Sequence, residues 1–136
     1  MIAMTLADIA GAVGAPSAPD GAVTGEVRID SRAVGPGDLF VALRGEHSDG
    51  HDFASAALDA GASGVLVEHP TTRRDIIVPD TLAALQSLAR QVFSLDQPLT
   101  FGLTGSSGKT STKDLLAQVL AAFGPTLAPV GSFNNE

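Results

Sequence analysis

The stretch Thr104-Gly105-Ser106-Ser107-Gly108-Lys109-Thr110-Ser111 decides the fold class of this chain. It follows an apolar run, Leu99 to Leu103, that predicts a strand, and it leads into a helix predicted from Thr110 to Phe123. Strand, glycine-rich loop and helix in this order are typical of the phosphate-binding unit of nucleoside triphosphate-binding proteins. Glycines let the backbone wrap around phosphate oxygens, and the N–H groups of the loop and of the helix N-terminus supply positive potential. The chain is therefore predicted to be an α/β protein with a triphosphate-binding loop.

Two side chains of this loop have predicted contacts with the triphosphate. Lys109 is expected to reach the β- and γ-phosphates, and the hydroxyl of Thr110 is expected to complete the coordination of Mg²⁺. The common form of the motif has a glycine five residues before the second one, but Leu103 occupies that position here and Gly102 precedes it. The alternative interpretation is a Gly/Ser turn that is followed by Lys-Thr by chance.

Helices and strands alternate upstream of the loop. A first helix, capped by Thr5 with Asp8 three residues on, has Leu6, Ile9, Ala10 and Val13 on one face. Thr81 is predicted to cap a long helix with an apolar face of Leu82, Leu85, Leu88, Ala89 and Val92. Between them the pattern predicts a helix at about 52–60, ended by Gly61, and strands at residues 23–29, 39–43, 65–67 and 76–78.

Gln97-Pro98 ends the long helix and is the predicted domain boundary, which gives domains 1–97 and 98–136. The second part is predicted to hold one strand, one helix and a further strand from Thr126 to Val130. Roughly 38 residues are too few for a phosphate-binding domain, because compact domains rarely fall below about 50 residues. We therefore expect residues 98–136 to be the start of a larger ATPase domain, and the chain to be the N-terminal piece of a longer protein.

Composition and charge limit the classes of function. A hydrophobic content of 44% is enough for a core, and a net charge of −7 argues against nucleic acid as a partner, since binding its phosphates needs a basic patch. The absence of cysteine excludes disulfides and thiolate sites. No apolar stretch approaches the roughly 20 residues that span a bilayer, and the N-terminus lacks the basic start of a secretory signal. We expect a cytoplasmic location without membrane insertion.

Two polar loops follow the strands predicted at 23–29 and 39–43, where ligands of α/β sheets tend to bind. Arg32 could pair with a diphosphate, and Ser31 and Ser48 could bind a base edge or a ribose. The alternative is that these are turn residues, with Asp30 and Asp49 as loop caps.

Other polar residues have simpler interpretations. A metal site at the three histidines is not expected, and His69 is interpreted as a solvated loop residue. Arg73-Arg74-Asp75 is interpreted as a charged surface turn. Asn134-Asn135-Glu136 could reach substrate or could be a frayed polar end.

Taken together, these motifs resemble the start of a Mur ligase, a family of ATP-dependent amide-forming enzymes of peptidoglycan synthesis. Four features match in order: Asp30-Ser31-Arg32, the run 37–43, Asp49-Gly50-His51-Asp52-Phe53 and the loop 104–110. Within the family, Lys113-Asp114 and the run 131–136 are most similar to members that join D-Ala-D-Ala to UDP-MurNAc-tripeptide. Members that add the third amino acid more often show Gly-Thr-Asn-Gly-Lys at the loop.

The resemblance implies an N-terminal uridine-binding domain followed by the first β-P-loop-α-β unit of a parallel-sheet ATPase. The loop Thr104 to Ser111 would bind ATP, with Lys109 as the catalytic residue on the transferred phosphate and Thr110 on Mg²⁺. The UDP end would be held by Ser31, Arg32, His47 and Ser48, and Asn134 and Asn135 would lie in the substrate cleft. Such an enzyme phosphorylates the terminal carboxylate of its substrate, and the amine of D-Ala-D-Ala attacks the acyl phosphate.

The resemblance also implies a monomeric parent enzyme, and its later metal ligands, carbamylated lysine and C-terminal ATP contacts lie outside this sequence. Catalysis by this chain alone is therefore not expected. The alternatives are a stand-alone uridine-nucleotide-binding module, a generic phosphate-loop NTPase, and another Mur ligase such as the enzyme that adds the third residue.

Overall fold

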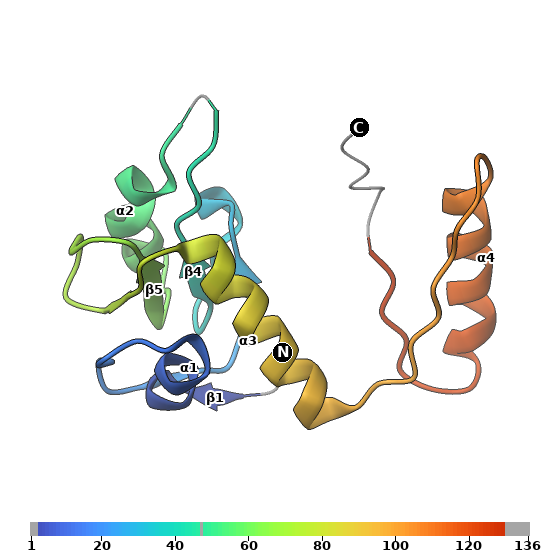
Figure 1. Ribbon diagram of the computed structural model, residues 1–136, viewed down its shortest axis with the longest axis horizontal. Helices are drawn as coiled ribbons and strands as arrows, with labels where there is room; N and C mark the ends of the chain where they lie inside the picture. The colour runs from blue at the N-terminus through green and yellow to red at the C-terminus, as the bar shows by residue number, and fades with distance from the viewer. Residues whose placement is uncertain (1–2, 47, 130–136) are drawn as a thin grey trace. The chain divides into compact units, whose positions relative to one another are not determined.

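A computed structural model describes residues 3–46 and 48–129 of the chain (Figure 1). Its contacts divide the chain into two units, Met1–Pro98 and Leu99–Glu136. This division lies one residue from the boundary predicted at Gln97-Pro98.

The first unit is built on a four-stranded parallel sheet in the order β3-β4-β5-β6. Its strands are β3 (Val27–Arg28), β4 (Leu39–Val41), β5 (Gly64–Val67) and β6 (Asp75–Ile77). The 3₁₀ helix η1 (Ser31–Ala33) connects β3 to β4, and η2 (Gly50–Phe53) with α2 (Ala54–Asp59) connects β4 to β5. The helix α3 (Thr81–Asp96) follows β6. The α/β prediction is confirmed by this sheet, with all four strands parallel.

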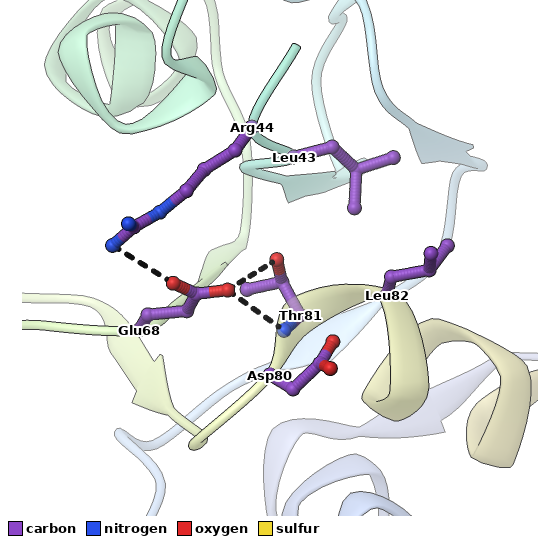
Figure 2. Close-up of a pocket in the computed structure, with 6 residues that line it drawn as sticks. All are labelled: Leu43, Arg44, Glu68, Asp80, Thr81 and Leu82. Atoms are coloured by element: carbon purple, nitrogen blue, oxygen red, sulfur yellow. Dashed lines mark hydrogen bonds and ion pairs between the residues drawn. The ribbon is translucent and has the colours of Figure 1, made fainter.

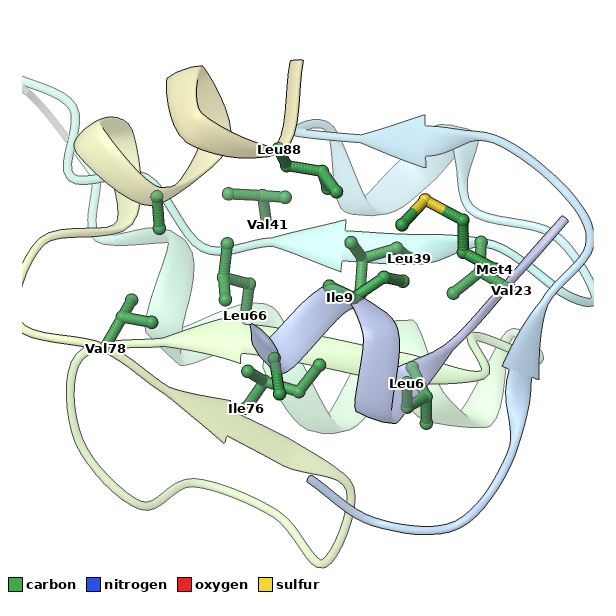
Figure 3. Close-up of a cluster of buried hydrophobic side chains, with 12 residues drawn as sticks. Met4, Leu6, Ile9, Val23, Leu39, Val41, Leu66, Ile76, Val78 and Leu88 are labelled. Carbon is green, nitrogen blue, oxygen red and sulfur yellow. The ribbon is translucent and has the colours of Figure 1, made fainter. Parts of the chain in front are cut away.

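Both faces of the sheet are covered, because successive residues of a strand point to opposite sides. Leu39, Val41 and Leu66 lie in a cluster with Leu6 and Ile9 of α1 (Leu6–Val13) and Leu88 of α3 (Figure 3). The alternate residues Phe40, Val65 and Val67 pack with Ala54 and Ala57 of α2. The helices α1 and α3 therefore cover one face and α2 covers the other.

The predicted cap of the first helix is confirmed. The Thr5 hydroxyl accepts a hydrogen bond from the Asp8 N–H at 3.0 Å, and the Asp8 carboxylate accepts one from the Thr5 N–H at 3.3 Å. Gly14 ends this helix in the left-handed conformation, with φ 72°. A two-stranded antiparallel ribbon flanks the helix, formed by β1 (Met4–Thr5) and β2 (Ala22–Val23).

The cap and face predicted for the long helix are wrong in part. Asp80 is the N-cap, since its carboxylate accepts from the Ala83 N–H at 2.9 Å, and Thr81 is the first helical residue. Thr81 is buried, and its hydroxyl donates to the carbonyl of Ala42 at 2.9 Å. The inward face consists of Thr81, Ala84, Leu85, Leu88 and Val92, whereas Leu82 and Ala89 are exposed. The polar Thr81 enters the core because a carbonyl at the end of β4 is within reach.

Two further predictions need correction in this unit. The strand predicted at 23–29 is two short strands in different sheets, interrupted where the N–H groups of Thr24 and Gly25 donate to the carbonyl of Gly37. Within Arg73-Arg74-Asp75, only Arg73 is exposed. The Arg74 guanidinium donates to the carbonyls of Ser63 at 2.6 Å and Asp20 at 3.0 Å, so it ties loops together.

The second unit consists of the glycine-rich loop and the helix α4 (Lys109–Ala121), one residue ahead of the predicted start. No strand forms at Leu99–Leu103 or at residues 126–129, and Val130 lies outside the described residues. An isolated extended segment is not a stable strand, because its backbone groups need neighbouring strands. Leu99, Leu115 and Leu127 are accordingly exposed. The two strands predicted to flank loop and helix are therefore not present in the described part of this unit.

Among the helices that the structure describes, none combines the length and apolar character needed to cross a bilayer.

Gly50 is expected to tolerate no side chain. A Cβ at this position would lie 2.7 Å from the Leu43 carbonyl oxygen and 2.8 Å from the Leu43 nitrogen. We expect Gly50→Ala to lower the free energy of unfolding by about 1–3 kcal/mol, because backbone atoms have to shift. Gly11→Ala is the control, since nothing lies within 4 Å of its Cβ and alanine should stabilise α1 by about 0.5–1 kcal/mol. Urea denaturation followed by circular dichroism measures both, and equal stability of the two variants would contradict this packing.

Candidate functional site

The carboxyl ends of the four parallel strands carry most of the polar residues considered for binding, as expected for an α/β sheet. The 3₁₀ helix η1 follows β3, and a short hairpin from Arg44 to Asp49 follows β4. Glu68 and His69 follow β5, and Asp80 and Thr81 follow β6. The loops after β3 and β4 are the two that the sequence predicts as the UDP site.

Arg32 is held by Asp30 at the start of η1. The Asp30 carboxylate caps η1 by accepting from the Arg32 N–H at 3.0 Å, which confirms the predicted loop cap. It also accepts from the Arg32 guanidinium at 2.9 Å (Nε) and 2.8 Å (Nη2). These hydrogen bonds from Arg32 lower the pKa of Asp30 to about 2. The Arg32 side chain is 88% exposed, so the guanidinium N–H groups that do not bond Asp30 can donate to an anion from solvent.

The described residues of the hairpin after β4 are joined in two places. The Gly45 N–H donates to the Ser48 carbonyl at 2.9 Å, and Arg44 and Asp49 form a bridge at its base. Ser48 is exposed near the tip. His47, which the sequence also predicts as a UDP contact, lies outside the described residues.

A shallow pocket of about 260 Å³ lies beside this hairpin (Figure 2). Two leucines, Leu43 and Leu82, line it together with the polar residues Arg44, Glu68, Asp80 and Thr81. The Arg44 guanidinium pairs with the Glu68 carboxylate at 2.9 Å, and that carboxylate accepts from the Thr81 N–H at 3.4 Å (Figure 2). Ser31, Arg32 and Ser48 do not line this pocket, so the sequence prediction missed this part of the edge.

His51 is the other residue that the sequence prediction missed. Its buried ring lies 2.5 Å from the Asp49 carboxylate through Nδ1, and its Nε2 accepts from the Glu68 N–H at 2.9 Å. Because Nε2 accepts, the ring proton is on Nδ1. The ring of His69 stacks on it, with centroids 4.6 Å apart, so His69 is exposed but is not simply a solvated residue. The hydrogen bonds from His51 also lower the pKa of Asp49. The Asp49 carboxylate also accepts from the His51 N–H at 3.0 Å as the N-cap of η2, which confirms the loop cap predicted at Asp49.

The glycine-rich loop leads directly into the N-terminus of α4. Gly108 has φ 74° and ψ 1° as the N-cap of α4, a conformation that favours glycine, and nothing lies within 4 Å of its Cβ position. The Lys109 ammonium lies over the loop and donates to the Gly105 carbonyl at 2.5 Å. The hydroxyl-bearing residues Thr104, Ser106, Ser107, Thr110 and Ser111 are exposed around it. The arrangement fits a triphosphate, since backbone donors, a cation and hydroxyl groups share one loop. Asn134 and Asn135 lie outside the described residues.

Comparison with known proteins identifies the family. The model of the Mur ligase family, catalytic domain, matches residues 24–93, which run from the end of β2 to α3 and exclude the glycine-rich loop. The UDP-N-acetylmuramoyl-tripeptide–D-alanyl-D-alanine ligase of Mycobacterium tuberculosis is 47% identical over all of this chain and 33% of its own length. The Escherichia coli enzyme of the same name is 44% identical over 81% of this chain and 25% of its own length.

Solved structures agree with these relatives. MurF from Acinetobacter baumannii matches with a TM-score of 0.76 at 31% identity, over 90% of this chain and 28% of that one. The MurF ligase of Thermotoga maritima in complex with ADP matches with a TM-score of 0.62 at 37% identity, over 74% of this chain and 24% of that one. The chain spans about a third or less of the length of these relatives. These likenesses in sequence and fold show that the chain belongs to the Mur ligase family and is MurF-like.

Proposed function

We propose that this chain provides the UDP-substrate site and the ATP-binding loop of a ligase that joins D-Ala-D-Ala to UDP-MurNAc-tripeptide in peptidoglycan synthesis. The observation that carries the proposal is the 47% identity with such a ligase across the whole chain. The geometry supports it independently, because a phosphate-type loop and a polar sheet edge occur in the two units. Under this proposal residues 1–97 form the UDP-substrate domain and residues 98–136 form the start of the ATP-binding domain, in a monomeric cytoplasmic enzyme.

ATP and Mg²⁺ are assigned to the loop from Thr104 to Ser111. Lys109 would hold the transferred phosphate, the backbone from Gly105 to Gly108 would surround the phosphate oxygens, and Thr110 would bind Mg²⁺. ATP supplies activation of the substrate carboxylate for attack by the amine of D-Ala-D-Ala. The MurF ligase of T. maritima is in complex with ADP, which supports an adenine nucleotide as a ligand of such an enzyme. Asn134 and Asn135 are proposed to lie in the substrate cleft.

The UDP end is assigned to the loops after β3 and β4. Arg32 would pair with the diphosphate through its exposed guanidinium, and Ser31, Ser48 and His47 would bind the nucleoside. The two hydrogen bonds from its guanidinium to Asp30 would orient Arg32 for this contact. No nucleic acid partner is proposed, since the net charge is −7.

A ligase assay on the full-length protein tests this function. We expect continued ADP release to require both UDP-MurNAc-tripeptide and D-Ala-D-Ala. The tripeptide accepts the phosphate, and the enzyme turns over only when the amine of D-Ala-D-Ala consumes the acyl phosphate. Release without muramyl peptide would instead indicate a generic phosphate-loop NTPase. Binding of UDP by a full-length protein that never releases ADP would indicate a stand-alone uridine-nucleotide module.

The enzyme that adds the third amino acid remains the second candidate. A UDP-N-acetylmuramoyl-L-alanyl-D-glutamate–2,6-diaminopimelate ligase of Chlorobaculum tepidum is 41% identical over 81% of this chain. The same assay with UDP-MurNAc-dipeptide and diaminopimelate separates the two candidates. Activity with that pair alone would replace the first proposal by the second.

A further inference from the structure

The buried ring of His51 joins two segments that are far apart in sequence. Its Nδ1 bonds Asp49 at the end of the hairpin after β4, and its Nε2 bonds the backbone of Glu68 at the end of β5. Both ring nitrogens are therefore engaged, and the side chain is only 2% exposed. A satisfied buried ring of this kind fixes the distance between the segments that it bonds.

Glu68 extends this connection to the other side of the hairpin. Its carboxylate pairs with Arg44 at 2.9 Å and accepts from the Thr81 N–H at 3.4 Å (Figure 2). Arg44 and Asp49 are the two ends of the hairpin. The Glu68 carboxylate therefore holds Arg44 at one end of the hairpin. The Glu68 N–H bonds the His51 ring, and that ring holds Asp49 at the other end.

The exposed Ser48 depends on the residues that hold the two ends of the hairpin. The Gly45–Ser48 hydrogen bond is local to the hairpin, so these two residues take their positions from their neighbours Arg44 and Asp49. Ordering a loop on binding costs conformational entropy, and a loop that is already fixed avoids that cost. On the basis of the proposed function, we propose that His51 is a positioning residue for the UDP end of the substrate, acting through Asp49 and Glu68 on the neighbouring Ser48.

A binding experiment on the 136-residue chain tests this role with UDP as the probe. His51→Ala is expected to weaken UDP binding in calorimetry about tenfold, since both hydrogen bonds of the His51 ring are lost. His51→Gln keeps an acceptor near Nε2 for the Glu68 N–H, and His51→Asn keeps a donor near Nδ1 for Asp49. Each of these should recover part of the lost affinity, and the UDP-induced shift of the Ser48 amide in NMR spectra should follow the same order.

A control variant separates positioning from stability. Ile9→Val removes a methyl group of α1 from the buried cluster with Leu39 and Leu88, and it should lower the melting temperature without changing UDP affinity. If the His51 variants lose no more affinity than Ile9→Val at similar melting temperatures, His51 is structural only and the proposal is overturned.

Arg32→Ala tests the proposed UDP site separately from the role of His51. If Arg32→Ala weakens UDP binding and His51→Ala does not, the UDP site stands and the positioning role is wrong. If the wild-type chain does not bind UDP, or binds it equally well after Arg32→Ala, the assignment of the UDP end to these loops fails. The positioning role of His51 fails with that assignment.

Discussion

Lys109→Ala in the full-length protein is expected to lower the rate of ADP release by at least about 100-fold. The Lys109 ammonium lies over the glycine-rich loop, 2.5 Å from the Gly105 carbonyl, and it is the one charged side chain within residues 104–111. For a phosphate bound at this loop, Lys109 would be the nearest positively charged side chain. Loss of that charge raises the barrier more than it weakens ground-state binding, because negative charge is redistributed during transfer.

Lys113→Ala is the matched control for this prediction. Lys113 lies one turn further along α4, where its ammonium pairs with Asp114 at 3.1 Å and also bonds the carbonyl of Pro129. Its charge is thus engaged away from the loop, and its removal should leave most of the activity. UDP binding should be unchanged in both variants, since neither residue belongs to the proposed UDP site. Comparable losses in Lys109→Ala and Lys113→Ala would contradict the assignment of Lys109 to the phosphate.

Features that depend on neighbouring residues were predictable from the sequence. The Thr5–Asp8 cap spans three residues, and the alternation of Leu39, Phe40 and Val41 between two core clusters follows from strand geometry. The bends at Gly14 and Gly108 use the left-handed conformation that glycine favours. Such signals are local, because the interacting groups are separated by a turn or less.

Features that depend on distant partners were not predictable in this way. His51 bonds Glu68, 17 residues away, and Arg74 bonds the Asp20 carbonyl, 54 residues away. Thr81 reads as an N-cap in sequence, yet the carbonyl of Ala42 draws its hydroxyl into the core. The strand predicted at Leu99–Leu103 has the right composition, but composition cannot supply the adjacent strands that a sheet requires. Each of these outcomes is decided by tertiary contacts.

Asp38→Asn is expected to lower the free energy of unfolding at pH 7 by about 2–3 kcal/mol. The buried Asp38 carboxylate accepts from the Glu26 N–H at 2.6 Å and the Gly35 N–H at 2.9 Å. The Arg28 Nε lies 3.5 Å from it and, among the described residues, is a buried side-chain nitrogen without a hydrogen bond. An asparagine would keep one acceptor oxygen, but its NH2 group would face the N–H of either Glu26 or Gly35, and that hydrogen bond would be lost. Gly25 leaves no room for relaxation, since even a Cβ there would lie 2.1 Å from Asp38 Oδ1.

The same variant should change the dependence of stability on pH. The hydrogen bond from the Glu26 N–H is the main cause that holds the pKa of Asp38 below its usual value, with Gly35 and Arg28 adding to it. Because the folded pKa lies below the unfolded value of about 3.9, Asp38 contributes its full stability above that value and loses it as the pH falls through the folded pKa. Asp38→Asn should therefore lose less stability than the wild type below about pH 4.

Urea denaturation at a series of pH values between 7 and acid measures both effects of Asp38→Asn. Asp59→Asn, at the exposed end of α2, is the control and should stay within about 0.5 kcal/mol of the wild type at pH 7. If Asp38→Asn matched the wild type at pH 7 and lost as much stability in acid, the carboxylate would not be holding the turn before β4. The N–H groups of Glu26 and Gly35 would then have to find other acceptors, which is costly at a site this buried.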